Sequence, residues 1–369
     1  MAGATVRALG LMSGTSLDGI DIALVETDGE NRVRRGPSAT VPYPPEFRNR
    51  LRRALTEAQA IVDRADRPGT LAAVERELTE RHAEAVLRFI GNHALQPSAV
   101  DIVGFHGQTV LHRPERRLTV QIGDGSLLAR LTGIDVVDDL RAADCAAGGQ
   151  GAPMVPIYHW ALASAIPERP IAVLNIGGVA NVTWIGRDGA LVAFDTGPGN
   201  ALMDDWALRH TGFPIDTDGA LARSGTADMD VLARALQHAY FSRPAPKSLD
   251  RNDFRIDLVD GLPVATGAAT LLELTVRAVG LAQDAMPQPP ALWIVAGGGR
   301  RNGALMARLA DVVEAPVTTA EAHGWNGDSM EAEAWAYLAV RAREGLAITF
   351  PGTTGAPRPM TGGVYRPSP

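Results

Sequence analysis

Two glycine-rich turns, each flanked by apolar strands, constrain the fold of this chain more than any other feature. In the first half, segment 6–12 runs into Ser13-Gly14-Thr15-Ser16-Leu17-Asp18-Gly19 and then a second apolar stretch. In the second half, 171–176 runs into Gly177-Gly178, and a later strand ends in Asp195-Thr196-Gly197-Pro198-Gly199-Asn200. Backbone amides in such turns approach a phosphate closely because glycine has no Cβ. The repetition predicts a nucleotide held between two similar half-molecules.

The composition is that of a soluble globular protein with room for two domains: 369 residues, 46% apolar and 21% charged. A net charge of -7 argues against a nucleic-acid partner. No apolar run approaches the roughly 20 residues that cross a bilayer, and we recognise no signal peptide. A single cysteine, Cys145, excludes an intrachain disulfide and a cysteine-based zinc site. We therefore expect a cytoplasmic protein without a membrane partner.

Lysine usage narrows the nucleotide chemistry. Lys247 is the only lysine among 35 basic residues, and we expect it to be a solvated loop residue. A Walker P-loop needs Gly-Lys-Ser/Thr, and a protein kinase needs a strand lysine on the phosphates. Neither motif is present. A nucleoside triphosphate would be held here by backbone amides, hydroxyls, carboxylates and a metal.

Apolar spacing predicts the elements that carry these turns. Apolar residues at helical spacing predict one helix through Leu51, Leu55, Ala58 and Val62 and another from Leu71 to Ala85. Further strands are expected at 100–105, 118–122, 136–141 and 292–295, and helices at 266–279, 303–310 and 329–345. The tail from Thr349 to Pro369 is expected to be irregular. Ligands in α/β sheets gather at the carboxyl ends of strands, so the site is expected at these exits.

Asp195 is the first candidate for catalysis. It ends the apolar stretch Leu191–Phe194 and precedes a glycine turn, a position that suits a general base. The alternative is a helix N-cap or an Asx turn, which aspartate often makes. The match with the N-terminal strand–turn–strand favours the functional interpretation.

The other polar turns leave two interpretations open. Gly14-Thr15-Ser16 with Asp18 and Asp21 could bind phosphate, with a carboxylate near a metal, or could form an ordinary hairpin turn. Gly297-Gly298-Gly299 after a strand is a weak phosphate signal without help from the following helix. His106 is the one histidine expected near a site, although its position favours a structural histidine over a functional one. Asp139, Arg141 and Asp144 could hold a sugar or form a salt bridge.

Taken together, the motifs resemble the anhydro-N-acetylmuramic acid kinase family, along nearly the whole chain and in the same order. The motifs are Met12–Asp21, His106-Gly107-Gln108-Thr109, Gln121-Ile122-Gly123-Asp124, Gly148–Pro153, Asn175–Asn181, Phe194–Asn200, Gly297-Gly298-Gly299 and Met330-Glu331-Ala332. The family belongs to the actin/hexokinase/Hsp70-like ATPase superfamily. The resemblance implies an α/β protein with two RNase-H-like domains and an active-site cleft between them. We place these domains at 1–160 and 161–369, and the C-terminal helix or tail is allowed to return to the first.

The resemblance also implies the reaction. Water opens the anhydro bridge of 1,6-anhydro-N-acetylmuramic acid, and ATP phosphorylates the freed 6-oxygen to give N-acetylmuramic acid 6-phosphate, in cell-wall (peptidoglycan) recycling. ATP and Mg²⁺ are the implied cofactors, the amino sugar is the small-molecule substrate, and a homodimer is left open. Two rivals stay open: an ordinary sugar kinase of the superfamily, and an actin- or Hsp70-like ATPase that binds a protein partner.

The residue roles follow from the matched motifs. Asp195 matches the catalytic aspartate, and Glu331 an acidic position on the sugar side. The substrate-binding set is His106, Gln108, Gln121, Asp124, Arg141 and Glu331, and Asp18 is the metal candidate. The ATP-binding set is Gly14, Thr15, Ser16, Leu17, Asp18, Gly19, Ile20, Asp21, Gly177, Gly178, Asn181, Gly197, Gly199, Asn200, Gly297 and Gly298.

Three positions depart from the family pattern. Leu140 stands where the family usually has Phe, and Thr349 stands where it has Asn before Phe-Pro. The Pro246-Lys247-Ser248 loop lacks the Thr-Gly that usually follows. These departures bear on the sugar pocket and the C-terminal loop rather than on the reaction class.

Overall fold

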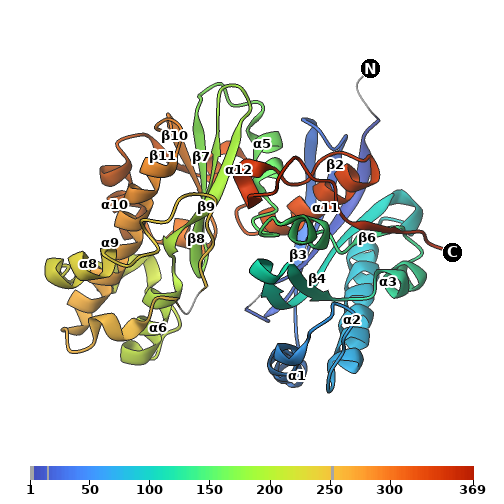
Figure 1. Cartoon of the computed structure of the whole chain (residues 1–369), viewed down its shortest axis with the longest axis horizontal. Helices are drawn as coiled ribbons and strands as arrows, with labels where there is room; N and C mark the ends of the chain where they lie inside the picture. The colour runs from blue at the N-terminus through green and yellow to red at the C-terminus, as the bar shows by residue number, and fades with distance from the viewer. Residues whose placement is uncertain (1–3, 15, 251–252) are drawn as a thin grey trace. The chain divides into compact units, whose positions relative to one another are not determined.

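The chain folds into two compact units (Figure 1). The computed structural model describes residues 4–14, 16–250 and 253–369, so Thr15 lies outside the described residues. The first unit contains the chain up to Ser164 and, in addition, Ser329–Pro369; the second is Ala165–Asp328. The domain limits of 1–160 and 161–369 stay a prediction, whereas the segment from Ser329 onward packs with the first unit.

A seven-stranded sheet forms the centre of the first unit. Its order is β12-β6-β4-β1-β2-β3, and β5 pairs with β4. β1, β2 and β3 form an antiparallel meander, whereas β4 runs parallel to β1 and β6 runs parallel to β4. The strands are β1 Val6–Ser13, β2 Gly19–Thr27, β3 Val33–Pro42, β4 Ile102–Arg113, β5 Leu118–Ile122, β6 Val136–Asp138 and β12 Val364–Arg366. The helices are α1 Pro45–Glu57, α2 Leu71–Asn92, α3 Gly125–Thr132, α4 Ala142–Ala147, α5 Pro156–Ala163, α11 Met330–Arg343 and α12 Pro351–Thr354.

Two glycines let α11 lie directly on this sheet. A Cβ on Gly10 of β1 would lie 1.8 Å from the carbonyl oxygen of Ala332, and one on Gly104 of β4 would lie 2.0 Å from that of Trp335. Any larger residue at either position would push the helix away. The close packing explains why a helix from the C-terminal part of the chain belongs to the first unit.

The second unit repeats the topology of the first. Its sheet has the order β11-β10-β7-β8-β9, with β7, β8 and β9 as the antiparallel meander and β10 and β11 parallel to β7. The strands are β7 Ile171–Ile176, β8 Val179–Ile185, β9 Leu191–Pro198, β10 Leu292–Ala296 and β11 Val317–Thr319. The helices are α6 Ala201–Thr211, α7 Ala220–Arg223, α8 Met229–Leu236, α9 Val264–Ala282 and α10 Gly303–Val313. Both units have the RNase-H-like arrangement, and the predicted α/β fold class is confirmed.

Helix α9 is more apolar than the sequence analysis recognised. The segment Val264–Ala285 is long and apolar enough to cross a membrane by length and composition alone. In the structure, 61% of its most apolar window is buried, and the helix packs against α6, α8, α10 and β9. Burial of this kind is that of a core helix in a globular unit.

Several local expectations were wrong. The strand predicted at 100–105 continues to Arg113 as β4, and the one predicted at 136–141 ends at Asp138 as β6. Val62 lies beyond the end of α1 and its side chain is 74% exposed, because the helix gives way to a 3-10 turn at Ala58–Ala60. The tail is also not irregular throughout, since it contains α12 and β12. β12 pairs with the edge strand β6, and Arg366 forms an ion pair with Asp138 at 3.2 Å. Local sequence carries no signal for pairing with a strand so far away along the chain.

Candidate active site

Asp195 lies inside β9, which continues to Pro198, so the prediction that it ends its strand was wrong. Asp195 is not the N-cap of any helix among the described residues. Oδ2 of Asp195 accepts a hydrogen bond from the Leu249 amide at 2.8 Å, and its main-chain N–H donates to the carbonyl of Lys247 at 3.0 Å. The pKa of this half-buried carboxyl is raised to about 7, because burial disfavours the charged form; the Leu249 amide opposes that shift. A carboxylate that titrates near neutral pH suits a general base.

Lys247 is not the solvated loop residue that the sequence predicted. Its side chain is 9% exposed, and its ammonium donates to the carbonyls of Tyr240 and Phe241, both at 3.2 Å. It also lies 4.8 Å from the centre of the Tyr240 ring. The favourable contacts offset the cost of removing a charge from water.

The predicted ATP-binding turns of the second unit come together at one edge of its sheet. The amide of Asn200 donates to the carbonyl of Gly177 at 2.7 Å, and that of Gly199 to the carbonyl of Gly178 at 3.0 Å. The Asn200 side chain donates to the carbonyl of Ile176 at 3.0 Å. A Cβ on Gly298 would lie 3.3 Å from the side-chain nitrogen Nδ2 of Asn200. Turns from three different strands therefore form one continuous backbone surface.

Asn181 joins this surface through the sheet. It lies on β8, paired with Asn175 on one side and with Asp195 on the other. The pairing places Asn181 next to the candidate base on the neighbouring strand.

The glycines of these turns fall into two groups. A Cβ on Gly199 would lie 2.2 Å from the carbonyl oxygen of Gly177, and one on Gly297, which has a φ of +73°, would lie 2.4 Å from Asn175 Oδ1. These two are required by packing or by backbone conformation. A Cβ on Gly177 or Gly178 would meet only ordinary contacts, at 3.6 and 3.7 Å, and neither has a positive φ. The protein itself would accept alanine there, so a glycine fits the close approach of a ligand.

The first-unit turn has the same open character. A Cβ on Gly14 would meet its nearest neighbour, Ser16 Oγ, at 3.6 Å. Ser16 and Asp18 are exposed and joined by a hydrogen bond of 2.7 Å. Leu17, Gly19 and Ile20 are instead buried, so only their backbone could reach a phosphate. Asp21 accepts from the Thr40 hydroxyl at 2.5 Å.

A cluster of polar side chains surrounds Arg141 in the first unit. Arg141 donates from Nε to His106 Nε2 at 3.0 Å and from a terminal nitrogen to the carbonyl of Gly151 at 2.7 Å. The His106 ring lies 4.4 Å from that of Trp335. Burial, and then Arg141, holds the pKa of His106 well below its usual value, so the ring is a neutral acceptor.

Glu331 joins this cluster at the start of α11. Burial lowers the pKa of Arg141 to about 10, and the charge of Glu331 opposes that shift. The pKa of Glu331 is raised, chiefly because the surrounding protein displaces water from the carboxylate. Asp21 adds to this shift and Arg141 opposes it, and the side chain still reaches solvent. The structure therefore brings together His106, Arg141 and Glu331 of the predicted substrate-binding set.

The remaining members of that set have structural contacts. Gln108 is buried and accepts from the Ser13 hydroxyl at 2.7 Å, and Asp124 caps α3 by accepting from the Leu127 amide at 2.9 Å. Gln121 and His106 line a pocket of about 150 Å³, and Gln121 Oε1 and His106 Nδ1 have no partner among the described residues. Buried polar atoms are normally paired, so a water or ligand is the expected partner.

Asp18 is compatible with a magnesium ion. In the part of the chain that the structure describes, no group of three or more His, Cys, Asp or Glu side chains is placed to hold a metal. Mg²⁺ in kinases is bound chiefly by substrate phosphates and waters, with one or two carboxylates. An exposed carboxylate beside Gly14 meets that requirement.

The second unit contains a cavity of about 510 Å³ for which the sequence carries no signal. It lies among α7, α8, α9 and α10, and its lining includes Ala269, Leu272, Ala304 and Ala307. Glu273 lies in its wall, paired with Arg277 at 2.7 Å and with Arg308 at 2.9 Å. α10 begins directly after the Gly297 turn, so the cavity neighbours the glycine surface along the chain.

Comparison with known proteins decides the family. The family model described as anhydro-N-acetylmuramic acid kinase matches residues 6–368. The chain belongs to this family. A relative of that name from Rhodospirillum rubrum is 55% identical over 98% of this chain and 95% of its own length. Those from Methylobacterium nodulans and Rhodopseudomonas palustris are 55% and 54% identical, over 97% of this chain and 99% and 98% of their own.

Solved structures of more distant proteins also align along most of this family member. A ROK family glucokinase from Streptomyces griseus has a TM-score of 0.41 and 14% identity, over 90% of this chain and 99% of its own. The (R)-2-hydroxyglutaryl-CoA dehydratase component A of Acidaminococcus fermentans has a TM-score of 0.46 and 12% identity, over 91% and 98%.

Proposed function

We propose that this protein is an ATP-dependent kinase that opens 1,6-anhydro-N-acetylmuramic acid with water and phosphorylates its 6-oxygen. Membership of the kinase family supports this function. The observation that carries the mechanism is Asp195, a half-buried carboxylate with a pKa of about 7, on a strand that ends in the glycine surface. Asp195 is the proposed base.

The proposed reaction balances with one base. Asp195 takes a proton from water as the water oxygen bonds to the anomeric carbon. The bond from that carbon to the 6-oxygen breaks, and the 6-oxygen bonds to the γ-phosphorus of ATP as ADP leaves. The products are N-acetylmuramic acid 6-phosphate, ADP and the proton, which Asp195 releases to solvent before the next turnover. Fixing water, sugar and phosphate together removes much of the entropic barrier.

Other groups would bind rather than react. The backbone at Gly14, Gly177 and Gly178 is open enough for a close approach, so their amides would contact phosphate oxygens of ATP. We assign the remaining turn residues to the same nucleotide. Arg141, kept charged and held by neutral His106, would bind an anionic or hydroxyl group of the sugar. Mg²⁺, bound in part by Asp18, would spread charge over the phosphates. The cleft between the two units stays a prediction.

We further propose that the adenosine part of ATP occupies the cavity among α7, α8, α9 and α10. Its alanine-rich walls fit an apolar purine, and arginines at its rim fit stacking on the ring. The biological setting we propose is peptidoglycan recycling in the cytoplasm. The proposed ligands are small molecules, and a homodimer is left open as the oligomeric state. Net charge of -7 supports a protein without a nucleic-acid partner.

Mass spectrometry of product made in ¹⁸O-water tests the reaction. Ring opening places one solvent oxygen at the anomeric position, whereas an ordinary sugar kinase, the rival, places none. The reading must be made before the free anomeric centre exchanges with water, so quenched early time points are compared with product incubated alone. Product without ¹⁸O at the first time point would contradict the proposed reaction.

The base is tested by Asp195→Asn. We expect turnover to fall by about 10²–10⁴-fold, with ATP binding retained. Asp188→Asn is the matched control, because Asp188 lies in the turn of the same hairpin and accepts a hydrogen bond from the Ala190 amide. Near-normal turnover of Asp195→Asn would remove this residue from the mechanism.

A further inference from the structure

Lys247, the only lysine of the chain, belongs to the loop that contacts Asp195, and its side chain is buried. Its ammonium donates to two consecutive carbonyls, those of Tyr240 and Phe241, and so closes segment 240–247 on itself. The faces of Tyr240 and Phe194 lie 4.8 and 5.9 Å from the charge. A buried ammonium with paired donors and aromatic neighbours is held firmly in place.

The same segment contacts Asp195 twice, and Leu249, two residues beyond it, makes a third contact. The Tyr240 hydroxyl donates to the carbonyl of Asp195 at 2.5 Å, and the amide of Asp195 donates to the carbonyl of Lys247 at 3.0 Å. The Leu249 amide then donates to carboxylate Oδ2 at 2.8 Å. Two of these contacts fix the strand, and the third fixes the carboxylate itself.

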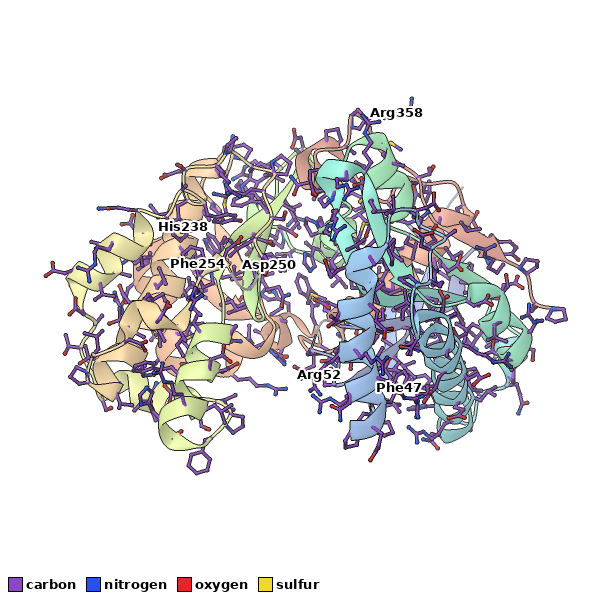
Figure 2. All side chains as sticks on the ribbon, turned by 60° about the horizontal axis from the view of Figure 1, so that its bottom comes forward. Phe47, Arg52, His238, Asp250, Phe254 and Arg358 are labelled. Carbon is purple, nitrogen blue, oxygen red and sulfur yellow. The ribbon has the colours of Figure 1, made fainter. Side chains whose placement is uncertain are left out.

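Aromatic packing anchors the segment beyond these contacts. Phe254 stacks on His238 at 4.5 Å and on Phe241 at 5.5 Å between ring centres. Figure 2 shows His238 and Phe254 together on the second unit. The Lys247 ammonium ties the loop to the carbonyls of Tyr240 and Phe241, and its contact with β9 is the Phe194 ring at 5.9 Å.

We infer that Lys247 is a positioning residue for Asp195, acting through the loop that presents the Leu249 amide to the carboxylate. This inference rests on the proposed role of Asp195 as the base. With Oδ2 held by the amide, Oδ1 is the oxygen that faces the reacting water; no described residue donates a hydrogen bond to it. The contact uses the main chain of residue 249, so it does not depend on the Thr-Gly that this loop lacks.

The test uses the full-length protein and three substitutions. Lys247→Met removes the ammonium but keeps an unbranched apolar chain. Leu249→Pro removes the amide donor directly. Arg243→Met is the matched control. Arg243 is exposed, and its guanidinium also lies over the Tyr240 ring, 5.7 Å from the ring centre.

We expect Lys247→Met to lower kcat by about 10²-fold, the effect of misplacing a reacting group by about 1 Å. Loss of the amide raises the pKa of the carboxyl, so the acid limb of the kcat/KM profile moves to higher pH. Affinity for a non-hydrolysable ATP analogue stays within about twofold, and Arg243→Met behaves like the unsubstituted protein. Leu249→Pro shifts the limb in the same direction, and adding Lys247→Met to it changes kcat by less than about threefold.

The outcomes separate this inference from the proposed function. If Asp195→Asn keeps its turnover, the proposed base is wrong and the inference fails with it. If Asp195→Asn is inactive but Lys247→Met matches Arg243→Met, the inference alone is overturned. An unmoved acid limb with a lower melting temperature would make Lys247 merely structural. Lys247→Gln, which keeps one donor, serves if the methionine variant does not fold, and we expect it to shift the limb less.

Discussion

Replacing Asp195 with asparagine is expected to stabilise the second unit above neutral pH while it abolishes turnover. The pKa of Asp195 is raised from 3.8 to about 7 because burial disfavours its charge. Between these two values the folded protein holds a proton that the unfolded chain has released. The free energy of unfolding therefore falls as the pH rises from about 4 to 7, and the loss is complete above pH 7.

The size of this effect follows from the shift. A difference of about three pKa units corresponds to about 4 kcal/mol of unfolding free energy. Solvent screening of the half-buried side chain reduces this, so we expect about 1–4 kcal/mol. Asparagine is neutral throughout, and its side-chain oxygen can still accept from the Leu249 amide. The variant therefore avoids the loss.

Urea unfolding at pH 4.5 and pH 8 measures the effect. Hydrogen–deuterium exchange of peptides from the second unit assigns each transition to that unit. The difference in unfolding free energy between variant and unsubstituted protein is compared at the two pH values, so the other titrating groups cancel. We expect the variant to gain at pH 8 relative to pH 4.5. An equal difference at both values would refute a raised pKa for this carboxyl.

Two further predictions concern the nucleotide. Gly178→Ala is expected to leave the melting temperature unchanged or slightly raised. It is expected to weaken ATP binding by about 10- to 150-fold in calorimetry, because it obstructs one charge-assisted hydrogen bond. Gly199→Ala is the contrasting variant, with a lower melting temperature, because its Cβ would lie 2.2 Å from the carbonyl oxygen of Gly177. Ala307→Phe fills part of the cavity among α7, α8, α9 and α10 and is expected to raise the KM for ATP at least tenfold without changing that for sugar, with Ala310→Phe as the exposed control on α10. Unchanged ATP affinity in Gly178→Ala, or an unchanged KM in Ala307→Phe, would contradict the respective assignment.

Much of the fold could be predicted because its signals are local. The strands that flank each glycine turn are short apolar runs, and they appear as β1, β2, β7, β8 and β9. The helices at 266–279, 303–310 and 329–345 are confirmed as α9, α10 and α11 to within a few residues. The strand ends were predicted less well, because β4 continues through His106 to Arg113 and β9 continues through Asp195 to Pro198.

The rest depends on contacts between distant segments. β12 exists through pairing with β6, and α11 meets the first sheet only because Gly10 and Gly104 lack a Cβ. Asp124 carries a family motif, yet the contact the structure gives it is an ordinary helix cap. The residues around Lys247 in the sequence do not distinguish a buried lysine from a solvated one, because its hydrogen-bond partners are main-chain carbonyls.

The glycines show how sequence and structure divide the argument. A sequence shows only that Gly178 and Gly199 occur in neighbouring turns. The structure shows that Gly199 leaves room for the chain itself, whereas Gly178 leaves room that no described part of its unit fills. Glycine costs conformational entropy that alanine would not, so a glycine without a packing role stands out. Gly14, Gly177 and Gly178 share this property, which supports a ligand contact at the turn of each unit.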